Sequence, residues 1–283
     1  MEKPPQPLSP GLYLVATPIG NLRDITLRAL DVLKAASLVV CEDTRMTGKL
    51  LSAFSLKKKM LSYNDHNAPR QRGTVLEAIS GGGAVAMVSD AGMPLVSDPG
   101  YKLVRDCLDL GFTVTSVPGA NAPLAALQLS GLPPDRFVFL GFLPPKAPAR
   151  RKVLAEWASA QATLIMFETG PRLQDSLDDM TAVLGSRPAA VVREITKMFE
   201  ESRRGTLVEL AAHYDAEGPP KGEIVVVIGP PPEESVSDET LEDQLRRALK
   251  DMSVRDAAAF VAQASGQPKK KVYEMAQKLA DEK

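Results

Sequence analysis

The sequence is poor in the residues that hold disulfide-rich and zinc-binding proteins together. Its 283 residues include two cysteines, Cys41 and Cys107, and two histidines, His66 and His213. Two cysteines cannot form a disulfide framework, so we expect a reducing compartment and a cytoplasmic protein. Zinc sites need several cysteine or histidine ligands close together, and no such cluster is present. We therefore expect no metal ion.

Long apolar runs and a strong net charge are absent as well. No apolar run reaches the roughly 18 residues that a membrane helix needs, and the first ten residues lack the apolar core of a signal peptide. We expect no membrane partner. The net charge of −1 does not indicate a nucleic-acid-binding protein. It does not exclude one, because local basic patches matter more than the sum.

Three common catalytic signatures are missing. There is no Walker A lysine loop, which argues against nucleoside triphosphate hydrolysis. No G-x-S-x-G elbow accompanies either histidine, as a Ser-His-Asp hydrolase would require. The dinucleotide fingerprint G-x-G-x-x-G is also absent. These absences leave a chain of ordinary globular composition that is long enough for two domains.

Short apolar runs alternate with segments of helical periodicity through most of the chain. Strands are predicted at 12–17, 38–41, 60–63, 84–88, 112–117, 137–141, 163–168, 189–193 and 223–228, and 194–205 is a polar stretch. Helices are predicted between most of these strands. This alternation predicts an α/β fold with a mostly parallel sheet that is covered by helices on both faces.

Two boundaries divide the chain. The turn at 118–121 ends the first half, and the linker 229–234 (GPPPEE) ends the second, because three consecutive prolines can continue neither a helix nor a strand. Beyond the linker the pattern is helical. Ser253 with Asp256 predicts a helix start, Gly266 a stop, and Pro268 the start of another helix. We expect domains at 11–120, 121–229 and 238–283, the last a small helical domain like a helix-turn-helix.

Several predicted strands end in residues suited to contact a ligand. The stretch 81–100 (GGGAVAMVSDAGMPLVSDPG) leads from a buried strand into a turn that holds Asp90, Gly92 and Pro94. In open α/β sheets, ligands bind beyond the carboxyl ends of the strands. Comparable turns stand at 17–21, 41–45, 118–119, 167–172 and 193–197. Each alone can be an ordinary connection or a helix cap with a local ion pair. Six in succession favour an active site in a cleft between two domains.

Taken together, these segments resemble the ribosomal RNA small subunit methyltransferase I family. The similarity rests on TPIGNL at 17–22 with Asp24, CEDTR at 41–45, SDAGMP at 89–94, SDPG at 97–100, VPGAN at 117–121, FETGPR at 167–172, REITK at 193–197 and KGE at 221–223. It spans residues 11–229, and the helical tail also resembles the C-terminal domain of that family. The first turn is poorer in glycine than that of the tetrapyrrole methylases, which favours the RNA-modifying branch.

The resemblance implies a fold and an activity. The fold would be two α/β domains of the tetrapyrrole methylase type, with a cleft for S-adenosyl-L-methionine between them, in a homodimer. The activity would be 2′-O-methylation of a cytidine ribose in the decoding region of 16S ribosomal RNA. The substrate would be the small-subunit ribosomal RNA or the assembling 30S subunit, and the sequence does not choose between them.

The resemblance also assigns roles to single residues. The residues that bind the cofactor would be Pro18, Asp90, Ala91, Gly92, Met93, Pro118, Gly119, Phe167, Glu168, Gly222 and Ile224. Among these, Asp90 would accept hydrogen bonds, and Phe167 and Ile224 would flank the adenine. Candidates for the base that activates the ribose hydroxyl are Glu42, Asp43, His66, Glu168 and Glu194. RNA phosphates would be held by Arg45, Arg172, Arg193, Lys197, Lys269, Lys270 and Lys271.

Two functions of other classes stay open at this point. A small-molecule methylase of the tetrapyrrole type would share the cofactor cleft but would have no need of the lysine-bearing tail. A non-catalytic RNA-binding protein would explain the tail but not the acidic strand ends. The run 269–271 can also be a solvated helix face with no ligand at all.

Overall fold

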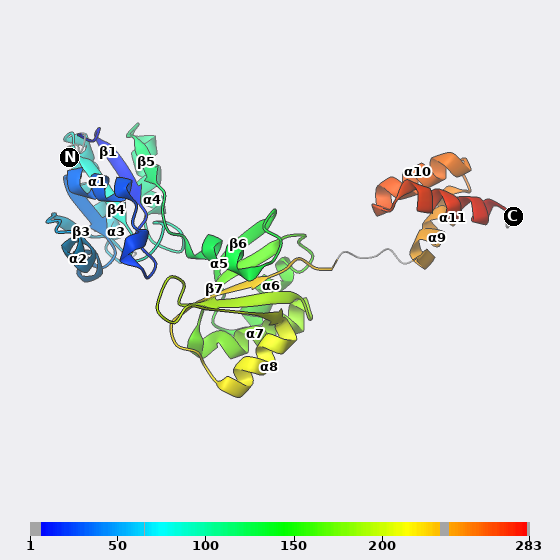
Figure 1. Cartoon of the computed structure of the whole chain (residues 1–283). Coiled ribbons are helices and arrows are strands. Elements are labelled where there is room, and N and C mark those ends of the chain that lie inside the picture. The colour runs from blue at the N-terminus through cyan, green and yellow to red at the C-terminus, as the bar shows by residue number, and fades with distance from the viewer. Residues whose placement is uncertain (1–6, 65, 233–237, 282–283) are drawn as a thin grey trace. The chain divides into compact units, whose positions relative to one another are not determined.

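The computed structural model describes residues 7–64, 66–232 and 238–281. The chain divides into two compact units, Met1–Pro231 and Pro232–Lys283. The larger unit contains two five-stranded sheets, and the smaller one is helical (Figure 1). Within these described residues, no helix is both long enough and apolar enough to cross a membrane.

The first sheet has the strand order β3-β2-β4-β1-β5, and all of its strand pairs are parallel. Its strands are β1 (Gly11–Val15), β2 (Leu38–Cys41), β3 (Met60–Ser62), β4 (Ala84–Val88) and β5 (Val114–Val117). Successive strand residues point to opposite faces, so one side packs on α1 (Leu27–Ala35) and α2 (Thr44–Ala53). The other side packs on α3 (Ala68–Ser80) and α4 (Tyr101–Asp109). The predicted parallel sheet with two helical layers is thus confirmed for this half. Cys41 and Cys107 are both buried and free.

The second sheet has the order β6-β7-β10-β8-β9, and only its β6–β7 pair is parallel. Its strands are β6 (Phe137–Phe142), β7 (Thr163–Thr169), β8 (Pro188–Arg193), β9 (Glu201–Thr206) and β10 (Glu223–Ile228). The prediction of a mostly parallel sheet is therefore wrong for this half. The interpretation of 194–205 as a polar stretch missed a strand, because residues 201–205 belong to β9. This strand lies at the sheet edge, where polar and charged residues such as Arg203 and Arg204 are tolerated.

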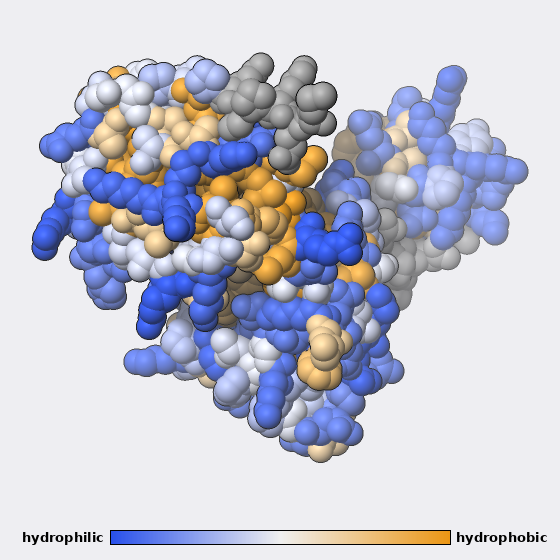
Figure 2. Space-filling model, turned by 60° about the vertical axis from the view of Figure 1, so that its left-hand side comes forward, coloured by the Kyte–Doolittle hydropathy of each residue, from blue (hydrophilic) through white to orange (hydrophobic). Residues whose placement is uncertain are grey.

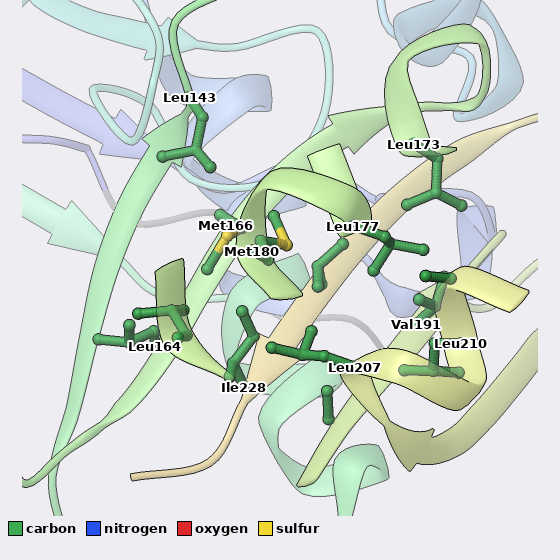
Figure 3. Close-up of a cluster of buried hydrophobic side chains, with 14 of the residues drawn as sticks. Leu143, Leu164, Met166, Leu173, Leu177, Met180, Val191, Leu207, Leu210 and Ile228 are labelled. Carbon is green, nitrogen blue, oxygen red and sulfur yellow. The ribbon is translucent and has the colours of Figure 1, made fainter. Parts of the chain in front are cut away.

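The central strand β10 shows how the second sheet is covered. Ile224, Val226 and Ile228 face a core that includes α6 (Ala147–Glu156), α7 (Gly170–Leu184) and α8 (Leu207–Glu217). Val225 and Val227 face the opposite side, where α5 (Ala122–Ser130) packs. Figure 3 shows the first of these cores, in which side chains from β7, β8 and β10 meet those from α7 and α8.

A buried ion pair connects α6 with α7. Arg150 donates from Nε to Oδ2 of Asp179 at 2.6 Å, and the two side chains are 4% and 3% exposed. Arg151 reaches the other carboxylate oxygen at 2.5 Å from a side chain that is 56% exposed. Asp179 is thus a buried acceptor that holds two arginines from the neighbouring helix.

The turn after β1 joins the two halves of the larger unit. Ile19 is buried in the cluster that α5 forms with Val225 and Val227 of the second sheet. At Gly20 a Cβ atom would lie 2.5 Å from Cγ of Lys197, so this backbone approaches the segment after β8 very closely. A side chain at position 20 would therefore force Lys197 and its neighbours to move, which favours glycine there.

The smaller unit is a bundle of α9 (Asp238–Ala248), α10 (Val254–Ser265) and α11 (Lys269–Asp281) around an apolar core. The predicted helix boundaries are confirmed. The Asp256 N–H donates to Oγ of Ser253, which caps α10, and Gly266 ends this helix at φ +67. Figure 2 shows mainly hydrophilic side chains on the visible surface of this unit. The last residues of the predicted linker, 233 and 234, lie outside the described residues.

Candidate functional site

The parallel register brings the carboxyl ends of the first sheet to one edge. Val15 of β1 pairs with Val88 of β4 and with Val117 of β5, and Val88 also pairs with Cys41 of β2. The turns that follow these four strands therefore leave the sheet at the same level. This is the edge at which ligands bind in open α/β sheets.

Hydrogen bonds tie these turns to one another. Thr17 and Gly92 exchange two backbone hydrogen bonds, with N–O distances of 2.8 and 3.1 Å. The Asp43 N–H donates to Oδ1 of Asp90 at 3.2 Å. The turns after β1, β2 and β4 thus form one connected layer above the sheet edge.

A cavity of about 260 Å³ lies against this layer, between the two sheets. It is lined from the first half by Ile19 and the loop between β4 and α4, and from the second half by the ends of β6, β7 and β10 and the start of α5. The lining residues are Ile19, Ala91, Gly92, Met93, Val96, Ser97, Asp98, Asn121, Ala122, Pro123, Phe142, Phe167, Glu168, Thr169, Ile195, Gly222, Glu223, Ile224 and Val225.

Aromatic rings form much of the apolar wall. The ring of Phe167 lies 5.0 Å from that of Phe139 in an edge arrangement and 5.3 Å from that of Phe142. Phe142 is 54% exposed at the cavity although it is apolar. Such an exposed ring beside a cavity is suited to cover a flat, partly apolar ligand.

Polar groups also line the cavity. Asn121 caps α5 by accepting from the Leu124 N–H at 2.9 Å, so the positive end of the α5 dipole lies at the cavity. Thr169 and Glu223 add a hydroxyl and a carboxylate to the lining. The cavity therefore offers an apolar slot and a few polar groups, the usual composition of a small-molecule site.

The loop between β4 and α4 has an unusual backbone. Leu95 and Ser97 adopt φ values of +73 and +66, and Gly92 and Gly100 lie at +79 and +127. Non-glycine residues in this region each carry strain of about 1–3 kcal/mol, and such strain clusters at ligand sites. A Cβ at Gly100 would lie 2.4 Å from Cε of Met87, so the loop is also closely packed on the sheet.

Asp98 belongs to this loop and lines the cavity. Burial raises the pKa of its carboxyl to about 6, the negative charge of Glu42 adds to the rise, and a hydrogen bond with Ser89 opposes it. Asp98 and Glu42 also line a narrower recess next to the sheet edge. An aspartic acid with a pKa this high accepts protons near neutral pH far better than an ordinary one.

A second charged cluster stands at the opposite wall. Lys197 donates to Oε1 of Glu194 at 2.7 Å and to Oε2 of Glu223 at 2.9 Å. The hydrogen bond from Lys197, followed by one from the Glu223 N–H, lowers the pKa of Glu194. At Gly222, with φ +99, a Cβ would lie 2.3 Å from the Glu194 carboxylate. Glu194 is thus packed against bare backbone and held in its charged form.

The residues expected to bind the cofactor fall into two groups. Seven line the cavity: Ala91, Gly92, Met93, Phe167, Glu168, Gly222 and Ile224. Four lie in the turns at the sheet edge without lining it: Pro18, Asp90, Pro118 and Gly119. Gly119 is packed so closely on Ala16 that a Cβ would lie 2.9 Å from the alanine side chain.

Of the candidate bases, only Glu168 is among the residues that line the cavity. Glu168 is buried, however, and accepts from Ser176 Oγ at 2.5 Å. Hydrogen bonds from Arg45 lower the pKa of Asp43 to about 2. His66 is exposed in the turn before α3. A lowered pKa makes a carboxylate a weaker base, which disfavours Asp43 and Glu194 for proton transfer.

The cations expected to hold phosphates make contacts within the protein. Arg172 donates to the Leu143 carbonyl at 2.7 Å, and Arg193 donates to Glu201 at 2.6 Å. Arg45 is bound by Asp43 through its guanidinium. In the smaller unit, Lys269 and Lys270 line an open groove between α10 and α11 together with Arg255 and Tyr273.

Sequence reasoning gave no role to Asp98, Asn121 or Phe142, although all three line the cavity. The motifs at 97–100 and 117–121 contain the first two residues, so their position after strands was the available signal. No sequence signal indicated Phe142, because its exposure follows only from the packing of β6. Among the described residues, no group of three or more histidine, cysteine, aspartate or glutamate side chains is arranged to hold a metal ion.

Two family models match this sequence. The model described as Tetrapyrrole (Corrin/Porphyrin) Methylases matches residues 11–211, and that described as RsmI C-terminal HTH domain matches residues 235–280. A protein of Mesorhizobium japonicum named Ribosomal RNA small subunit methyltransferase I is 49% identical over 283 residues, which cover 99% of this chain and 96% of the relative. One of the same name from Erythrobacter litoralis is 53% identical and covers 97% of each chain.

Solved structures share the fold of the larger unit. Uroporphyrin-III C-methyltransferase from Thermus thermophilus, in complex with S-adenosyl homocysteine, matches with a TM-score of 0.55 and 21% identity, over 77% of this chain and 97% of that one. A cobalt precorrin-4 methyltransferase matches with a TM-score of 0.58 and 20% identity, over 77% of this chain and 94% of that one.

Proposed function

Because this chain belongs to the tetrapyrrole methylase family and is an S-adenosyl-L-methionine-dependent methyltransferase, we propose that its acceptor is the 2′-hydroxyl of a cytidine ribose in the decoding region of 16S ribosomal RNA. The observation that carries this proposal is the near-full-length match to relatives named for small-subunit ribosomal RNA, which extends through the helical tail. The two small-molecule methyltransferases compared above cover 77% of the chain. The tail is therefore the part that a tetrapyrrole-type activity leaves unexplained.

The cavity fits a methyl donor that carries a nucleoside. At Gly92 the bare backbone forms the wall, and a Cβ there would lie 3.3 Å from Cγ2 of Ile19. Phe167 and Ile224 provide apolar surfaces for an adenine, while Asn121 and Thr169 provide polar groups for a sugar or an amino acid. The predicted domains 11–120 and 121–229 would each supply one wall.

S-adenosyl-L-methionine supplies an electrophilic methyl group on a sulfonium sulfur. The protein residues have to align the ribose hydroxyl with that methyl carbon, exclude water and accept a proton. Alignment of two reactants in one site supplies much of the acceleration in such displacements. The rigid loop between β4 and α4 and the layer of tied turns are suited to this task.

Positively charged side chains would hold the RNA around this cavity. We propose Arg45, Arg172, Arg193 and Lys197 for phosphates near the cleft, and Lys269, Lys270 and Lys271 in the tail. Asp90, Pro18, Pro118 and Gly119 would complete the cofactor site from the sheet edge. We further propose that the protein acts in the cytoplasm as a homodimer, as the sequence resemblance implies.

The direct test incubates the purified protein with labelled S-adenosyl-L-methionine and either naked 16S ribosomal RNA or small ribosomal subunits. We expect a single 2′-O-methyl mark on a cytidine of the decoding region, mapped by resistance of the ribose to alkaline cleavage. A porphyrinogen serves as the competing acceptor. Methyl transfer to the porphyrinogen but not to the RNA would overturn the proposed function in favour of a small-molecule methylase.

Truncation after Pro230 should leave cofactor binding intact, because every residue that lines the cavity lies upstream. RNA affinity and turnover should fall, most visibly at moderate salt. The competing expectation is that the helical unit only stabilises the protein or a dimer. In that case the melting temperature or the oligomeric mass would drop, and the RNA affinity of the folded molecules would not change. All three quantities can be measured on one preparation.

Replacing Lys269 and Lys270 together by alanine should weaken RNA binding with little effect on sequence preference. Each lost phosphate contact should reduce the slope of log K against log salt by about 0.7–0.9. The matched control replaces Lys250 and Lys278 by alanine. This variant loses the same charge from the same unit, but neither lysine lines the groove. Equal losses in both double variants would point to net charge rather than to the groove.

A further inference from the structure

Asp98 combines three features that no other candidate carboxylate has together. It lines the main cavity, it is partly buried, and it also lines the narrower recess at the sheet edge. Glu42 reaches only the recess, and Asp43 and His66 reach neither. Asp98 is therefore the carboxyl that connects the cavity with the sheet edge.

The backbone around Asp98 is held in place on both sides. Ser97 precedes it with φ +66, and Gly100 follows with φ +127. Gly100 packs so tightly that a Cβ would lie 2.4 Å from Met87 and 2.8 Å from Leu95. A side chain on such an over-determined loop keeps its position without a ligand, as a reacting group in a preorganised site must.

The surroundings of Asp98 are acidic or neutral on every element that packs against it. Glu42 follows β2, Ser89 and Asp90 follow β4, and Tyr63 lies after β3. In the part of the chain that the structure describes, no lysine or arginine lines the cavity or the recess. Burial and these like charges raise the pKa of Asp98 to about 6, which leaves a carboxylate at neutral pH that gains a proton readily.

We propose that Asp98 is the general base of the methyl transfer, a role that rests on the function proposed above. Asp98 accepts the proton of the ribose 2′-hydroxyl while that oxygen forms its bond to the methyl carbon. The carbon–sulfur bond breaks in the same step, and its electron pair stays on the sulfur, which becomes a neutral thioether. Asp98 then releases the proton to water through the open side of the cavity.

The test uses full-length Asp98→Asn, which keeps the shape and removes the proton acceptor. The single-turnover rate should fall by about 100-fold or more. The affinity for S-adenosyl homocysteine, measured by calorimetry, should stay within about threefold. The wild-type rate should rise with pH to a plateau above about 6, and the variant should lack this rise. Asp109→Asn, at the exposed end of α4, is the control that should leave the rate unchanged.

A second readout does not depend on catalytic activity. Carboxyl carbon NMR of the wild-type protein, with the Asp98 signal assigned by its loss in Asp98→Asn, should show a titration near 6. The proposal would be overturned if Asp98→Asn had a single-turnover rate within about threefold of wild type. It would also be overturned if Asp98 in the wild-type protein titrated at the ordinary aspartate pKa of about 3.9. A tenfold loss of cofactor affinity at an unchanged rate would instead make Asp98 a cofactor ligand. Failure of the wild-type protein to methylate the RNA would refute the proposed function itself. The role of Asp98, which rests on that function, would then fall with it.

Discussion

Replacing Asp179 by alanine is expected to lower the free energy of unfolding by about 3–5 kcal/mol, because it leaves a buried arginine charge without its partner. Asp179 is the acceptor for Nε of Arg150 at 2.6 Å, and both side chains are almost fully buried. The single tryptophan, Trp157, packs against the same core at the end of α6 and reports on its unfolding. Urea unfolding followed by Trp157 fluorescence therefore measures the effect directly.

Two further variants isolate the buried pair. Arg151→Ala removes the solvated partner of the same carboxylate and should cost no more than about 1 kcal/mol. The double variant Arg150→Met with Asp179→Leu removes both charges and should recover much of the lost stability. If Asp179→Ala costs no more than Arg151→Ala, the buried pair does not stabilise the contact between α6 and α7.

Gly92→Val should reduce the affinity for S-adenosyl homocysteine at least tenfold, which corresponds to about 1.4 kcal/mol or more. The reason is that Gly92 lines the cavity with bare backbone and exchanges hydrogen bonds with Thr17. A branched side chain would meet Ile19, and at φ +79 it would also strain the turn. Titration calorimetry of the purified variant gives the affinity, and thermal melting gives the cost in stability.

Gly82→Val provides the matched control for this strain. Gly82 has φ +87, but a Cβ there would have no neighbour within 4 Å, and the residue does not line the cavity. It should therefore lose a similar amount of stability, about 1–3 kcal/mol, without losing affinity. Equal affinities for Gly92→Val and the wild type would place the cofactor away from this turn.

Local sequence patterns predicted the structure correctly where all the residues that determine an element lie within one short segment. The run Ala84–Val88 is uniformly apolar and forms β4 with those same bounds. Ser253 and Gly266 cap and end α10 as predicted, since these residue types satisfy helix ends through contacts a few residues away. The motifs at 89–94 and 167–172 likewise lie at the cavity. The division into domains at 11–120, 121–229 and 238–283 stays a prediction.

The sequence by itself therefore determined the α/β class, the parallel first sheet, the helical tail and, through its spaced motifs, the family. Only the tertiary structure decided the antiparallel pairing of the second sheet, the edge strand β9 and the contact of Arg150 with Asp179, 29 positions along the chain. It also decided that Asp98 and Phe142 meet at one cavity. Hydrophobic periodicity reports which residues are buried, but it carries no information on strand direction or on which distant residues meet. Strand direction and the contacts between distant residues depend on long-range packing. The residues of this site come together only through such packing.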